Sequence, residues 1–108
     1  MAWLVRDGEV LSSLEVVNSR RARARGLLGR EGIDGAMLLP GTRSVHTFGM
    51  RFPIDVAFLD RDWRVVRVVT MKRGRITRLV VKAQVVIEAE AGSFREWNLT
   101  CGDQLELR

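Results

Sequence analysis

The residues of this chain that could do chemistry gather in one stretch, Ser44–Asp60. It holds the sole histidine, His46, together with Met50, Arg51 and Asp55. Histidine changes its charge near neutral pH, and a neighbouring carboxylate can orient its ring. A carboxylate at the start of an apolar strand is partly desolvated and needs a partner, for which arginine is well suited. We therefore expect a ligand site at His46, Met50, Arg51 and Asp55.

Two interpretations of Asp55 stay open. In the first, an ion pair of Asp55 with Arg25 or Arg51 fixes the turn before the strand. In the second, Asp55 belongs to the floor of a polar pocket, where His46 and Arg51 face a small anionic ligand. A binding or accessory module is the leading functional hypothesis, with an unknown small ligand or protein as its partner. The candidate supporting residues are Arg25, Asp60 and Asp103.

An enzymatic function is the second hypothesis. A hydrolase or transferase would need His46 and an acid such as Asp55 to meet in a concave site. Cys101 is the single cysteine, and no catalytic-cysteine signature surrounds it, so we expect it to lie in a turn. A metal centre needs three or four ligands at suitable spacing. One histidine, one cysteine and scattered aspartates do not supply that spacing, so we expect neither a metal nor another cofactor.

The net charge of +5 is carried almost entirely by arginine. Arginines that cluster early in the chain could contact phosphates, and such binding would weaken steeply with salt. No nucleic-acid motif accompanies them, the chain has no tyrosine, and its three tryptophans are scattered. A solvated helix face is therefore the preferred interpretation, and weak nucleic-acid binding is kept as a third hypothesis. The residues concerned are Arg20, Arg21, Arg23 and Arg30.

Short apolar runs separated by turn residues predict a mainly β fold, a small barrel or sandwich-like sheet. Asp7-Gly8 lies between two strand-like runs, which is typical of a tight hairpin. Residues 19–28 predict one short helix, which makes the fold α+β by label. The run from Leu79 to Ala89 predicts a long strand that bends or breaks near residues 82–84, and residues 91–93 predict a turn. Pro53 ends the segment before a buried strand, residues 54–59.

Four pieces of the chain, in the same order, resemble the family called domain of unknown function 192. They are Arg25-Gly26-Leu27-Leu28-Gly29-Arg30, Gly35-Ala36-Met37-Leu38-Leu39, the stretch Ser44–Asp60, and Gly102-Asp103. Many members have a Trp-Met-Lys/Arg-Asn-Thr run where this chain has His46-Thr47-Phe48-Gly49-Met50-Arg51-Phe52. The resemblance implies a small, mainly β domain and supplies no reaction.

The whole chain, residues 1–108, is expected to form a single domain, because it has no linker, repeat or low-complexity tract. A lone cysteine and an N-terminus without a secretory pattern predict a cytoplasmic location. No apolar run approaches the length that crosses a bilayer, so no membrane is expected as a partner. A monomer or a weak homodimer is expected.

Overall fold

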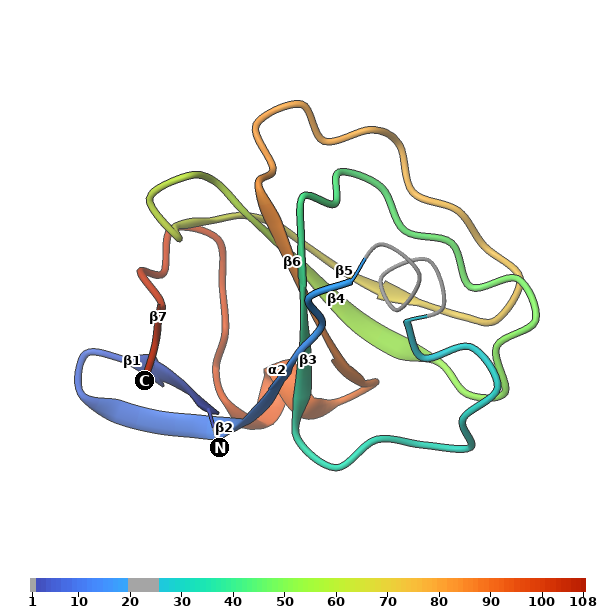
Figure 1. Cartoon of the computed structure of the whole chain (residues 1–108), viewed down its shortest axis with the longest axis horizontal. Coiled ribbons are helices and arrows are strands. Elements are labelled where there is room, and N and C mark those ends of the chain that lie inside the picture. Colours follow the sequence, from blue (N-terminus) through green and yellow to red (C-terminus); the bar gives the residue numbers. More distant parts are fainter. Residues whose placement is uncertain (1, 20–25) are drawn as a thin grey trace.

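The computed structural model describes residues 2–19 and 26–108. In this part of the chain the fold consists of β-strands and one short helix (Figure 1). The strands are β1 (Ala2–Arg6), β2 (Glu9–Val16), β3 (Ala36–Pro40), β4 (Ile54–Leu59), β5 (Val65–Met71), β6 (Val85–Glu90) and β7 (Glu106–Leu107), and the helix is α2 (Ser93–Glu96). The prediction of a mainly β fold is therefore confirmed.

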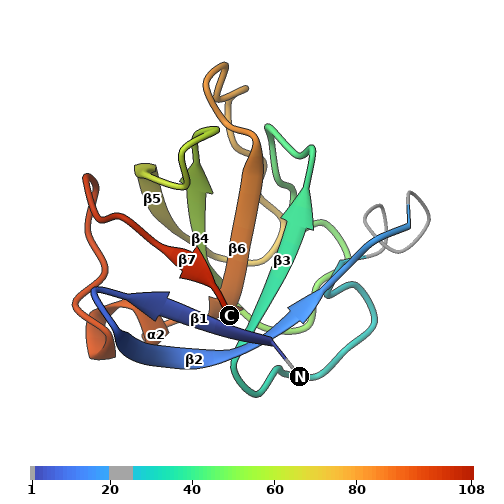
Figure 2. The same ribbon diagram turned by 60° about the vertical axis from the view of Figure 1, so that its left-hand side comes forward.

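All seven strands belong to one sheet, in the order β5-β4-β6-β3-β2-β1-β7. The β2–β3 pair is parallel and the other pairs are antiparallel. The sheet curls into a half-barrel, so that β1, β2 and β7 face the central strands (Figure 2). Both chain ends meet at the same edge, where Trp3 and Arg108 exchange backbone N–H···O bonds of 2.8 and 3.0 Å.

Alternating side chains of the central strands form two cores on opposite faces of the sheet. We call the one inside the curl the concave core; it contains Ala57 and Ile87 and is closed by Phe94 of α2. We call the other the convex core; it contains Val56 and Val86 and is covered by loops instead of strands. The cover consists of the described segments 17–19, 26–33, 41–53 and 72–83, which contribute Val17, Leu27, Val45, Met50, Phe52 and Ala83. Any site on the convex face is therefore built from loops lying on a rigid sheet.

The Asp7-Gly8 hairpin is confirmed. Strands β1 and β2 pair antiparallel, and Arg6 lies opposite Glu9. The two connecting residues have φ angles of 51° and 79°. A primed two-residue turn needs positive φ at both positions, and aspartate and glycine tolerate it best.

Two other predicted elements differ from the structure. The helix predicted over residues 19–28 falls mainly on residues 20–25, which lie outside the described residues; residues 26–29 form a turn. The run from Leu79 to Ala89 is a strand only from Val85, since Leu79 and Val81 project into solvent without a sheet partner. Residues 91–93 do turn the chain, and they lead directly into α2.

Candidate functional site

A cavity of about 180 Å³ lies on the convex side of the sheet. Strands β3, β4 and β6 supply its floor through Leu39, Ile54 and Glu88, and the covering loops supply its walls. Among the described residues, the rest of the lining consists of Gly26, Leu27, Leu28, Thr42, Ser44, Val45, His46 and Met50. Most of the wall is aliphatic, so the few polar groups decide what the cavity can hold.

Glu88 is the acidic residue of this cavity. The period of two along β6 places it on the same face as Val86, and it is paired across the sheet with Met37 and Val56. Glu88 is only 5% exposed. Because ionisation in this apolar setting is costly, burial raises the pKa of its carboxyl from 4.5 to about 7.

The Glu88 carboxyl has no hydrogen-bond or ion-pair partner among the residues that the structure describes. Within the same residues, every side-chain oxygen or nitrogen that is sealed from solvent has a hydrogen-bond partner. The carboxyl oxygens of Glu88 must therefore keep access to the cavity. A buried acid that faces a cavity and lacks a protein partner is able to bind a donor group from outside.

His46 and Met50, two of the four predicted site residues, line this cavity. Met50 is buried in the convex core, whereas His46 is exposed at the cavity rim. The imidazole stacks on Phe48 with ring centroids 5.5 Å apart and an interplanar angle of 23°. A backbone bridge to Ile76 fixes the position of His46 in the chain. The imidazole therefore lies at the cavity rim, and no carboxylate of the described chain forms a hydrogen bond with it.

Arg51 and Asp55, the other two predicted residues, lie outside the cavity lining. Arg51 reaches into solvent, where its Nη1 donates to Glu31 Oε1 at 3.1 Å. The predicted ion pair between Asp55 and Arg51 is therefore wrong, and Arg25 lies outside the described residues. The predicted acid of the site, Asp55, is replaced in the cavity by Glu88.

Asp55 instead holds α2 against the sheet. It is 3% exposed and points to the concave side, where its carboxylate accepts three hydrogen bonds. Thr70 Oγ1 donates at 2.7 Å, and the backbone N–H groups of Gly92 and Phe94 donate at 3.0 and 3.1 Å. The first N–H groups of a helix have no partner within the helix. Asp55 therefore works as a remote cap, which makes its role structural.

Asp60, one of the supporting residues, has a structural role. Asp60 Oδ1 accepts the N–H groups of Asp62 and Arg64 at 2.9 and 3.0 Å, which forms the turn between β4 and β5. Cys101 is free and exposed in a turn, as expected. Arg30, one of the arginines considered for phosphate contacts, binds both carboxylate oxygens of Glu15 at 3.1 and 2.9 Å.

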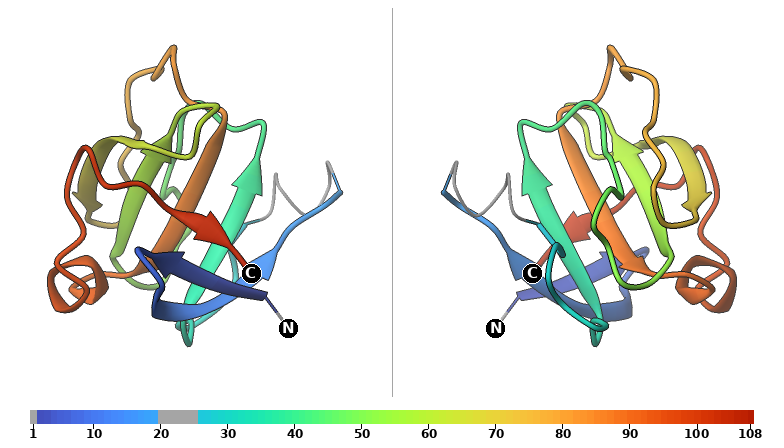
Figure 3. Two further views of the ribbon diagram at one scale, coloured as in Figure 1. Left: turned by 90° about the vertical axis from the view of Figure 1, so that its left-hand side faces the viewer. Right: turned by 90° about the vertical axis from the view of Figure 1, so that its right-hand side faces the viewer.

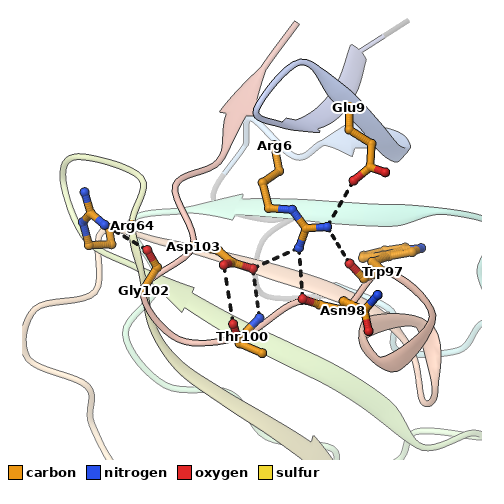
Figure 4. Close-up of polar contacts among 8 residues, drawn as sticks. All are labelled: Arg6, Glu9, Arg64, Trp97, Asn98, Thr100, Gly102 and Asp103. Carbon is orange, nitrogen blue, oxygen red and sulfur yellow. Dashed lines mark hydrogen bonds and ion pairs between the residues drawn. The ribbon is translucent and has the colours of Figure 1, made fainter.

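Asp103 belongs to a polar network that ties the β1–β2 hairpin to the segment after α2 (Figure 4). Arg6 Nη1 donates to Asp103 Oδ2 and to the carbonyl of Asn98, both at 3.0 Å, and Arg6 Nη2 donates to the carbonyl of Trp97 at 2.8 Å. Thr100 N–H donates to Asp103 Oδ2 at 3.0 Å. Burial alone would raise the pKa of Asp103, but these bonds from Thr100 and Arg6 lower it overall.

Glu88 is the residue that sequence reasoning missed. Its signal was an acid within the apolar run Val85–Ala89, in phase with Val86. An acid at that position of a strand buried on both faces must either have a partner or face a cavity. The acidic composition of the last quarter of the chain concealed this signal.

Within the described residues, no three histidine, cysteine, aspartate or glutamate side chains are grouped closely enough to hold a metal ion. No helix in the same part of the chain has both the length and the apolar character needed to span a bilayer.

The chain is similar to other proteins both in sequence and in fold. It is 38% identical over 63 residues to the UPF0127 protein PH1112 of Pyrococcus horikoshii, a match that covers 58% of this chain and 55% of that relative. Two crystal structures share its fold. One is a protein of unknown function from Novosphingobium aromaticivorans, with a TM-score of 0.78, 17% identity, and 97% and 82% of the two chains covered.

The other is a candidate transcription regulator from Sinorhizobium meliloti, with a TM-score of 0.80, 20% identity, and 97% and 90% of the two chains covered. At such identities the likeness concerns the fold alone. A family profile described as "Uncharacterized ACR", domain of unknown function 192, matches residues 2–107, nearly the full length. The chain therefore belongs to the domain of unknown function 192 family.

Proposed function

We propose that this protein is a small binding module whose cavity takes a cationic amine on a short apolar stem. The observation that carries the proposal is Glu88, a buried carboxyl that faces the cavity and has no partner among the described residues. An ammonium group supplies the donors and the charge that this carboxyl lacks. The aliphatic walls then contact the stem.

The size of the cavity limits the ligand. At about 180 Å³ it is slightly larger than an apolar cavity of roughly 150 Å³ that binds benzene, and below the usual range of drug-sized pockets. A free amine with a compact body fits this space, and so does one lysine side chain of a protein partner. An anionic ligand is disfavoured because Arg51 points away and Glu88 adds negative charge.

Isothermal titration with benzylamine, benzyl alcohol and benzoate tests the proposal, since the three ligands share a ring and differ in charge. Benzylamine should bind most tightly, and Glu88→Gln should weaken it by about tenfold or more, as expected for a hydrogen bond to a charged group. Glu90→Gln is the matched control, because Glu90 lies on the same face of β6 and is exposed. A short peptide that contains lysine tests whether the cavity takes a lysine side chain of a protein partner.

The pH dependence has a defined sign. Protonation removes the charge of Glu88, so benzylamine affinity should fall as the pH drops below about 7. Benzoate binding as tight as benzylamine binding, or an unchanged affinity in Glu88→Gln, would exclude this ligand class.

An acid–base enzyme is the second candidate, because Glu88 and His46 line one cavity and the pKa of Glu88 is about 7. Proton transfer is most effective when the pKa of the catalytic group lies near the working pH. A hydrolase of small esters should then lose its rate in both Glu88→Gln and His46→Ala. Hydrolysis of nitrophenyl acetate no faster than in buffer would count against it.

We also infer that the protein works in the cytoplasm, which the exposed free thiol of Cys101 supports, because oxidising compartments favour paired cysteines. Cell fractionation with an antibody to the native protein tests this location.

A further inference from the structure

The edge of the sheet that β5 forms carries a strongly basic surface. Between Trp63 and Ile87 the chain has seven lysine or arginine residues and no acidic residue. Five of these cations lie along two neighbouring hollows between β5 and the segment 75–82, and we call this surface the basic groove. They are Arg67, Lys72, Arg75, Arg78 and Lys82.

The cations of the basic groove have no acidic partner among the residues that the structure describes. The ion pairs of the described chain are formed by arginines outside the groove, namely Arg6, Arg30, Arg51 and Arg108. Residues 20–25, which are not described, contain only arginine and alanine and so cannot supply an acid. The positive field of the groove is therefore not neutralised within the fold, and it attracts an anionic partner.

The strand beside the groove has an open edge. β5 is the outermost strand of the sheet and pairs only with β4 (Figure 3). At its start, Val65 also exchanges backbone hydrogen bonds with Gly102 and Asp103. In the described chain, no backbone bond joins Val66–Met71 to any segment other than β4. An edge of this kind can accept an additional strand from another molecule.

Exposed aliphatic side chains accompany the cations. Ile76, Leu79 and Val81 are 66%, 64% and 70% exposed. The two hollows have volumes of about 530 and 350 Å³ and share Arg67 and Arg78, so they form one continuous path beside β5. The groove therefore offers backbone groups, positive charge and apolar surface in a row.

We propose that the basic groove docks an extended acidic segment of a partner protein, which adds as a strand to the edge of β5. The partner backbone hydrogen-bonds to Val66–Met71. Its carboxylates meet Arg67, Arg75 and Arg78, and interleaved aliphatic residues lie against Ile76 and Leu79. This inference is independent of the Glu88 cavity, which shares none of these residues.

Two other occupants fit the groove less well. Single-stranded nucleic acid is bound through aromatic stacking, and the groove has no aromatic side chain. An anionic membrane would meet the charges and the aliphatic residues but could not pair with the backbone edge of β5. Only a peptide uses all three features.

Fluorescence anisotropy with a labelled peptide of about ten residues, in which glutamate and valine alternate, tests the proposal. The peptide should bind, and an alternating lysine–valine peptide should not. A glutamate–valine peptide with alternate backbone nitrogens methylated keeps the charge and loses the strand hydrogen bonds, so its affinity should fall by about tenfold or more. Hydrogen exchange of the β5 amides at Val66–Met71 should slow when the unmodified peptide binds.

The variant Arg67→Glu/Arg78→Glu should weaken binding by at least about tenfold. Arg61→Glu/Arg95→Glu changes the net charge by the same amount at exposed positions outside the groove, and it should change the affinity by less than about twofold. Equal losses in the two double variants, or equal binding of the methylated peptide, would overturn the proposal. So would binding to phosphatidylserine vesicles or to single-stranded DNA in preference to the peptide, or a dimer in sedimentation that buries β5.

Discussion

Replacing Glu88 by glutamine should stabilise the folded protein at neutral and alkaline pH. Burial raises the pKa of Glu88 from 4.5 to about 7, so between these pH values the folded state binds a proton that the unfolded state releases. The free energy of unfolding therefore falls as the pH rises through this window. At about 1.4 kcal/mol per pH unit, the window amounts to roughly 3 kcal/mol. Below 4.5 the carboxyl is protonated in both states and contributes nothing.

Glutamine has nearly the same shape as glutamate and no charge, so it removes the titration without emptying the space. Its amide still has no partner in the part of the chain that the structure describes, which offsets part of the gain by about 1 kcal/mol. We therefore expect the Glu88→Gln variant to exceed the native protein by about 2 kcal/mol at roughly pH 8, and to match it or fall slightly below at roughly pH 4.

Urea denaturation followed by tryptophan fluorescence, repeated from acid to alkaline pH, measures this difference. Glu90→Gln is the control and should leave the stability within about 0.5 kcal/mol at every pH, because Glu90 is exposed. If Glu88→Gln and the native protein keep parallel stability curves across the whole pH range, then Glu88 does not titrate in an apolar cavity. The reasoning about the cavity would then be refuted.

Three further substitutions test the structural assignments. Asp55→Ala removes the acceptor of three hydrogen bonds and should cost about 3 kcal/mol of unfolding free energy, with loss of the protection of the α2 amides in hydrogen exchange. Thr47→Val should cost about 2 kcal/mol, because the buried hydroxyl donates to the carbonyl of Lys72 at 2.7 Å and accepts from the N–H of Arg75 at 2.8 Å. Asp103→Asn should cost about 1 kcal/mol at neutral pH. Because the folded pKa of Asp103 lies below 3.8, that last difference should disappear as the pH falls through the folded pKa.

Matched substitutions separate these effects from general damage. Asp62 is exposed, so Asp62→Ala should change the free energy of unfolding by less than about 0.5 kcal/mol, in contrast to Asp55→Ala. Thr47→Ser keeps the hydroxyl and should restore most of the loss seen in Thr47→Val. A Thr47→Val variant as stable as the native protein would mean that the two hydrogen bonds do not hold the segment 72–75.

The candidate site was only partly readable from the sequence. The stretch Ser44–Asp60 stood out because it concentrates unusual residue types, and His46 and Met50 do line the cavity. Asp55 shares that stretch but points to the concave side, because successive side chains of a strand face opposite sides. Arg51 lies in a bend and reaches into solvent towards Glu31. Nearness in sequence therefore did not imply nearness in space.

Sequence alone determined what depends on neighbours along the chain. The Asp7-Gly8 turn follows from two residues that tolerate positive φ, and the strands follow from short apolar runs between turn residues, since both are local properties. Only the tertiary structure decided which polar groups became partners. Helix α2 receives its cap from Asp55, a residue 37 positions before Gly92. Glu88 became a buried acid because loops from the segments 26–33, 41–53 and 72–83 cover its face of the sheet. Burial and electrostatics depend on what lies across space, and that is decided when the sheet curls and the loops close over it.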